Sequence, residues 1–107
     1  MYFVDYRDHL GIREGKPFKA TLFRGDQLLL GVNCLAPGQG QPVHMHANQD
    51  KFYFVLEGEG VFTVGDEVRS CGPGHAICAP AGVDHGVTND TADRLVFLMT
   101  MAPPPLG

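Results

Sequence analysis

The sequence has no dense run of basic residues, and this argues against nucleic acid as a partner. Its 107 residues include eight Lys and Arg against twelve Asp and Glu, for a formal net charge of −4. Binding to a phosphate backbone needs several clustered cations. The longest apolar stretches are also much shorter than a membrane-spanning helix. We therefore expect neither nucleic acid nor a membrane as a partner.

Cysteine is scarce, and its spacing gives no disulfide framework. The three cysteines, Cys34, Cys71 and Cys78, cannot all pair within one chain, and no two of them form a Cys-X-X-Cys motif. Charged residues begin at Asp5, before the apolar core of an export signal could form. We expect reduced thiols and a cytoplasmic location, with Cys34 and Cys78 as small buried side chains.

The apolar spacing of an amphipathic helix is missing from every window of the sequence. Instead, fourteen glycines and eight prolines divide the chain into short apolar segments, which are typical of β-strands. The expected strands are 18–24, 28–35, 52–56, 61–64, 68–71, 76–79 and 94–101. We predict about seven to nine strands in a single all-β sandwich or barrel spanning residues 1–107.

The two ends of the chain fit this sheet pattern less well. Residues 1–15 allow either one helical turn or a crossing strand. The proline-rich tail, residues 102–107, cannot join the interior of a sheet because proline has no N–H to donate. We expect it to lie outside the strands.

Histidine is the informative residue type. Of the five histidines, His44 and His46 are separated by one residue, so on an extended strand their side chains point to the same face. His85 follows the turn sequence 80–82, which could redirect the chain toward that pair. Three neutral imidazoles would leave open positions on a metal, as in catalytic sites. His-X-His alone is a weak signal, because surface strands also contain it by chance.

The residues around these histidines resemble the two motifs of the cupins. Residues 38–58 follow the first motif, from a glycine through His-X-His to a second glycine. Residues 74–89 match the second motif at every fixed position, from its glycine through Pro-X-Gly and His to a final Asn. The resemblance implies a jelly-roll barrel, or double-stranded β-helix, that binds one divalent transition metal (Fe, Mn, Ni or Zn). The implied ligands are His44, His46 and His85.

One position departs from the cupin pattern, where the family has a glutamate ligand. Counting back from the closing glycine, that position holds Lys51. Lys51 should share an inward face with Tyr53 and Val55, and Asp50 should face away unless a bulge shifts the register. Gln49 has the inward parity and is a possible extra ligand through its neutral oxygen.

The lysine leaves three interpretations open. Two unit charges about 4 Å apart interact by about 4 kcal/mol at an effective dielectric constant near 20, and a dication doubles the repulsion. In the first interpretation, Lys51 stands beside a three-histidine metal and holds the carboxylate of an anionic substrate or acts as a base. In the second it turns to the rim or to an acidic neighbour. In the third it replaces the metal in a metal-free pocket.

These observations favour a metal-dependent enzyme, an oxygenase, isomerase or lyase, acting on a small anionic organic molecule. Lys51 and Tyr53 are the candidate catalytic or substrate-binding residues, although a strand tyrosine is more often plain core. The alternative is a non-catalytic ligand-binding or sensor barrel, because one fold supports many functions. Phe52 and Phe54, which alternate with the inward residues, should pack against a second sheet or another subunit. Resemblance to small cupins implies a homodimer.

Overall fold

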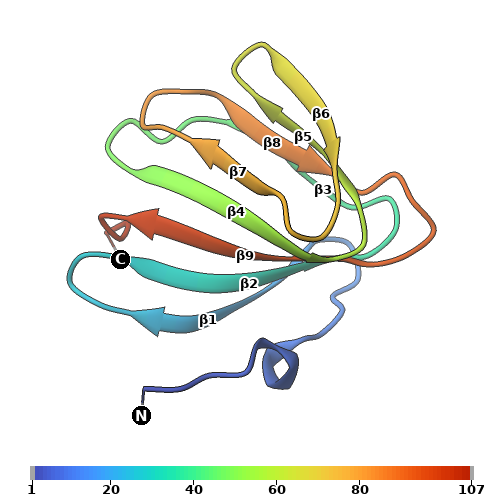
Figure 1. Cartoon of the computed structure of the whole chain (residues 1–107), viewed down its shortest axis with the longest axis horizontal. Coiled ribbons are helices and arrows are strands. Elements are labelled where there is room, and N and C mark those ends of the chain that lie inside the picture. Colours follow the sequence, from blue (N-terminus) through green and yellow to red (C-terminus); the bar gives the residue numbers. More distant parts are fainter. Residues whose placement is uncertain (1, 107) are drawn as a thin grey trace.

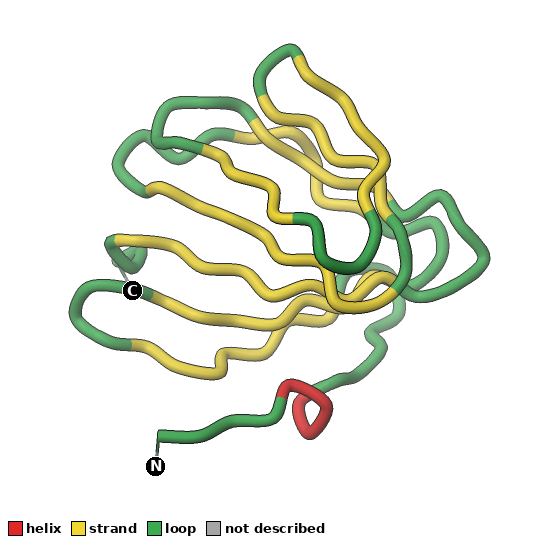
Figure 2. The backbone as a smooth tube through the Cα atoms, in the orientation of Figure 1, coloured by secondary structure: helices red, strands yellow, loops and turns green. Residues whose placement is uncertain are grey.

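The computed structural model describes residues 2–106, and strands dominate that range (Figures 1 and 2). One short 3₁₀ turn, η1 (Tyr6–His9), precedes them, so the helical alternative for the N-terminal residues is confirmed. The strands of the described range are β1 (Phe18–Arg24), β2 (Leu29–Leu35), β3 (Gly40–His44), β4 (Asp50–Glu57), β5 (Gly60–Val64), β6 (Glu67–Cys71), β7 (Ala76–Ala79), β8 (His85–Thr88) and β9 (Leu95–Ala102).

The strands form two antiparallel sheets that fold over each other (Figure 1). Within residues 2–106 the larger sheet has the order β1-β2-β9-β4-β7, and the smaller has the order β3-β8-β5-β6. Neighbours far apart in sequence, such as β2 with β9 and β3 with β8, pair antiparallel. This arrangement is the jelly-roll, or double-stranded β-helix, that the sequence predicts.

The interior between the sheets follows strand parity. On β4, Lys51, Tyr53 and Val55 are buried, whereas Phe52 and Phe54 are on the outer face and are exposed. The inner residues join a cluster from both sheets: Leu35, Tyr53, Val55, Phe62, Cys71, Ile77, Val87, Leu95 and Phe97. Burying an apolar side chain of this size stabilises the fold by about 1.5–3 kcal/mol.

A second apolar cluster lies on the outer face of the larger sheet. Val32, Cys34 and Val96 are buried there, and Tyr6 and Leu10 from the N-terminal segment pack against them. In Figure 1 this segment runs beneath β1 and β2. The N-terminal residues therefore cover a sheet face that would otherwise meet solvent.

The cysteine prediction is correct at one position and wrong at the other. Cys34 is buried as expected, but Cys78 is exposed. On β7 the inward residues are Ile77 and Ala79, so parity turns Cys78 outward. Within residues 2–106 we find no helix with the length and apolar character needed to span a bilayer.

Candidate metal centre

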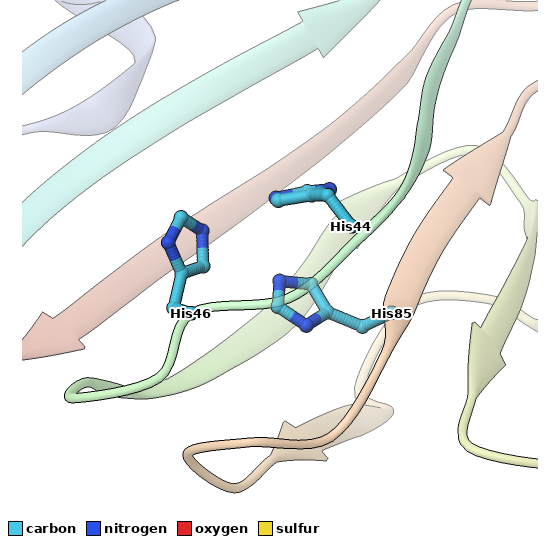
Figure 3. Close-up of side chains that lie close together, drawn as sticks. All are labelled: His44, His46 and His85. Carbon is cyan, nitrogen blue, oxygen red and sulfur yellow. The ribbon is translucent and has the colours of Figure 1, made fainter.

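Three histidine rings face one another at one end of the space between the sheets (Figure 3). One possible ligand atom from each of His44, His46 and His85 lies within 4.8 Å of the others. The ring centroids are 4.9 Å apart for His44 and His46, 4.4 Å for His44 and His85, and 5.4 Å for His46 and His85. The structure thus brings together the three residues that the sequence singled out.

Strand register positions two of the rings. His44 is the last residue of β3 and is the register partner of His85, the first residue of β8. Directly paired residues present their side chains on the same face of a sheet. The register shifts between Gln41 and His44, next to Pro42, where a proline is tolerated because its missing N–H is not needed.

The third ring is positioned by a turn instead of a strand. β3 ends at His44, so His46 lies in the loop to β4, and the expectation that one extended strand carries both histidines is wrong. The N–H of Gly82 donates to the backbone oxygen of His46 at 2.9 Å. The carboxylate of Asp50 accepts from the N–H of Ala81 at 2.9 Å. These bonds connect the loop that carries His46 to the turn that precedes His85.

Hydrogen bonds fix the tautomers of two histidines. Nδ1 of His44 lies 2.7 Å from the carbonyl oxygen of Pro42, and Nδ1 of His85 lies 3.1 Å from that of Val83. A carbonyl oxygen only accepts, so both Nδ1 atoms carry hydrogen and a neutral ring keeps its lone pair on Nε2. Backbone carbonyls orient metal-binding histidines in this way.

The donor set fits a metal ion. Nε2 of His85 is buried and has no hydrogen-bond partner in the described part of the chain, although buried polar atoms are normally paired. Burial lowers the pKa values of His46 and His85, and the charge of Lys51 acts in the same direction. Both rings are therefore held in the neutral form that binds metals. A transition metal at the three rings would supply the missing partner.

Lys51 points inward, as its parity predicts. It pairs in register with Ala79 and Met101, and its side chain is 8% exposed. Among residues 2–106 no carboxylate forms an ion pair with it. In this structure Lys51 therefore points inward without an acidic partner in the described chain, and its role beside a metal stays a prediction. Burial, with a smaller effect from the charge of Lys19, lowers the pKa of Lys51 to about 8.

The other residues of the predicted site lie around this lysine. Asp50 is exposed and faces away, as expected. Tyr53 is fully buried in the inner core, its hydroxyl has no partner within residues 2–106, and burial raises its pKa. Gln49 is half-buried just before β4. Its role as an extra ligand stays a prediction.

A cavity of about 430 Å³ opens beside His44 and Lys51. Its lining also includes Arg13, Lys16 and Lys19. With Lys51, four of the chain's eight Lys and Arg line this cavity. No carboxylate lines it in the described range. We did not predict these residues from the sequence, although three cations within residues 13–19 of an acidic chain indicate a possible anion-binding site.

Gln41 also lines this cavity and was missed. Its side chain is 8% exposed, and neither Oε1 nor Nε2 has a hydrogen-bond partner in the part of the chain that the structure describes. It pairs in register with Val87 of the inner core, so it faces the interior. Two unmet hydrogen-bonding atoms beside a cavity point to a polar ligand.

Comparisons with known proteins agree with this fold. A family model described as a cupin domain matches residues 31–101. The crystal structure of TT1209 from Thermus thermophilus is 39% identical, with a TM-score of 0.94, and the match covers 98% of this chain and 100% of that one. The uncharacterised protein SCO3923 of Streptomyces coelicolor is 33% identical over 81 residues, which are 76% of this chain and 75% of that protein.

A more distant structure supports the fold alone. A conserved protein of Klebsiella pneumoniae with a double-stranded β-helix domain is 21% identical, with a TM-score of 0.91. The match covers 100% of this chain and 94% of that one. The two sheets described above therefore recur in chains that share few residues with this one.

Proposed function

This chain belongs to the cupin domain family, and we propose that it is a metal-dependent enzyme acting on a small anionic organic molecule. The convergence of the three histidine rings supports the proposal, together with the buried, unpartnered Nε2 of His85. His44, His46 and His85 would hold one divalent transition metal, Fe, Mn, Ni or Zn. Such an ion supplies Lewis-acid polarisation of a substrate oxygen.

Lys51 would hold the acidic group of the substrate. Lys51 is 8% exposed and lines the cavity, so an ion pair with a carboxylate bound there is stronger than it would be at the open surface. Without a metal, a pKa of about 8 leaves Lys51 mostly charged at neutral pH. A metal dication nearby would lower that pKa further, and a bound substrate anion would raise it again. A substrate anion would also offset the repulsion between Lys51 and a metal dication.

The same arrangement serves several reactions. In an isomerase or a lyase the metal would polarise one substrate oxygen, and in an oxygenase Fe(II) would activate dioxygen, while the lysine holds an acidic group nearby. A non-catalytic barrel that binds small anions would share these features. Turnover separates these two classes, because a sensor or storage protein returns its ligand unchanged.

We also propose a homodimer. Phe52 and Phe54 are 40% and 36% exposed on the outer face of β4, and a second copy of the chain would cover them. Light scattering on the purified protein measures the mass directly, and a monomer at all concentrations would contradict this part of the proposal. The cytoplasmic location expected from the sequence stays a prediction.

Metal content tests the central proposal. Plasma mass spectrometry on untagged protein should find about one transition-metal ion per chain, and His46→Ala should lose it. His9→Ala is the matched control, since His9 is exposed on η1. Loaded protein would then be screened for oxygen consumption, isomerisation and elimination with small organic acids. Protein that contains no metal and binds none of Fe, Mn, Ni and Zn on reconstitution would contradict the proposal and favour a metal-free pocket.

A further inference from the structure

More cations line the mouth of the cavity than one acidic group would neutralise. Arg13, Lys16 and Lys19 line the cavity beyond Lys51. The ion pairs of the described chain join Arg7 to Asp5 and Arg94 to Glu57, so none of the lining cations takes part in one. Clustered cations without counterions attract anions and repel one another. A second acidic group at the mouth would relieve this repulsion.

The segment that carries two of these cations is fixed to the barrel. Nε2 of Gln39 donates to the backbone oxygens of Arg13 and Lys16, at 2.7 Å and 3.1 Å. Its Oε1 accepts from the N–H of Ala36 at 2.8 Å. Lys19 follows on β1, in register with Asn33 of β2. The backbone that carries these cations is therefore ordered before any ligand arrives, which lowers the entropic cost of binding.

Gln41 adds a second, independent constraint on the ligand. Its buried amide offers one acceptor and two donor hydrogens, and neither atom has a partner within residues 2–106. A carboxylate can meet only the donors, whereas a hydroxyl group both donates and accepts. An amide with both atoms free therefore matches a hydroxyl group, and a site built around one discriminates strongly against analogues that lack it.

We propose that the substrate is a hydroxy acid with two acidic groups. One acidic group binds at the metal centre and Lys51, the hydroxyl group bonds to Gln41, and the second acidic group, a carboxylate or a phosphate, binds to Arg13, Lys16 and Lys19. This assignment rests on the proposed metal centre, and it names the substrate class that the centre serves.

Calorimetric titration of the metal-loaded protein tests the second acidic group. The probes are malate, lactate, which has one acidic group, and 3-phosphoglycerate, in which the second group is a phosphate. Malate or 3-phosphoglycerate should bind at least tenfold more tightly than lactate, and the tighter of the two identifies the group. Replacing Arg13, Lys16 and Lys19 together by Gln should remove that preference and leave lactate within about twofold. Arg69→Gln, at an exposed cation on β6, is the matched control.

Succinate, which lacks the hydroxyl group, tests Gln41. Gln41→Met should weaken malate at least tenfold and succinate less than threefold, because only malate loses a hydrogen bond. Circular dichroism and the metal content of Gln41→Met establish that the variant is folded and loaded. Equal losses for malate and succinate would overturn the role of Gln41.

The remaining outcomes separate this inference from the proposed function. Protein that binds one metal ion but no probe at 10 mM, or all probes equally, would overturn the inference and leave the metal centre standing. Protein that prefers the probes with two acidic groups but binds no metal would overturn the proposed function instead. In that case the anion site alone would be the functional feature.

Discussion

The ammonium nitrogen of Lys51 lies 5.0 Å from the centroid of the Tyr53 ring, two residues further along β4. The face of an aromatic ring attracts a cation, but it does not replace the hydration that a buried ammonium group loses. Tyr53 itself has a buried hydroxyl group with no partner in the described range. In the absence of ligand, contacts within the protein therefore do not fully replace the hydration that these two polar groups lose on folding.

Replacing Lys51 by Met should stabilise the metal-free protein at pH 7. Burial lowers the pKa of Lys51 from 10.5 in the unfolded chain to about 8 in the folded one. At pH values between these two, the unfolded chain binds more protons than the folded one. Stability of the wild-type protein should therefore rise with pH across that window. The expected gain is up to about 3 kcal/mol at pH 7 and should shrink toward pH 10.

Urea unfolding of both proteins at pH 7 and pH 10, after metal removal by chelation and dialysis, measures this gain. Lys16→Met, at an exposed lysine, should change the free energy of unfolding by less than about 0.5 kcal/mol. A less stable Lys51→Met protein at pH 7 would show that Lys51 has a stabilising partner.

Tyr53→Phe should leave the free energy of unfolding within about 1 kcal/mol of the wild-type value, or raise it. The substitution removes a buried hydroxyl group without a partner among residues 2–106 and keeps the ring contacts with Phe62 and Phe97. Thermal and urea unfolding supply the comparison. A loss above about 2 kcal/mol would mean that the hydroxyl group is bonded in solution.

Asn89→Ala should destabilise the fold by about 3 kcal/mol without changing the metal content per folded chain. Nδ2 of Asn89 donates to the backbone oxygens of Leu35 and Asp93, and its Oδ1 accepts from the N–H of Thr91. Asn89 is fully buried, so the substitution leaves these groups unpaired. Asn48→Ala, at an exposed amide, is the control. Loss of metal from folded Asn89→Ala would contradict a purely structural role.

Gly58→Ala should cost at least about 3 kcal/mol of stability. Gly58 has a φ of 76°, and a Cβ atom there would overlap the backbone oxygen of Arg94. Gly15 has a φ of 84° but open space around it, so Gly15→Ala should cost only about 1 kcal/mol. Equal losses in the two variants would mean that backbone conformation, and not the contact with Arg94, limits position 58.

The sequence predicted those parts of the molecule that depend on local pattern. Alternating apolar residues on β4 placed Lys51 inside and Asp50 outside, and both positions are confirmed. The apolar segments did not identify β3 and β8, because Gly40–His44 and His85–Thr88 contain few apolar residues. The register that pairs His44 with His85 depends on the whole sheet, so local pattern could not supply it.

The cavity was harder to predict than the metal centre. Gln41 and Lys19 belong to strands of different sheets, and only the folded chain brings them to one cavity. Lys16 is part of the segment before β1, whose course is set by the side chain of Gln39. Neither relationship leaves a short motif in the sequence.

The two halves of the cavity lie on opposite layers of the sandwich. His44 and Gln41 are on β3 of the smaller sheet, whereas Lys51 and Lys19 are on β4 and β1 of the larger sheet. Since β3 and β1 are outermost strands of their sheets, no backbone ladder joins the two layers at this side of the described chain. A ligand that contacts both layers would connect β1 and β3 for as long as it is bound. Amide hydrogen exchange in these two strands should therefore slow when the cavity is occupied, even when no reaction occurs.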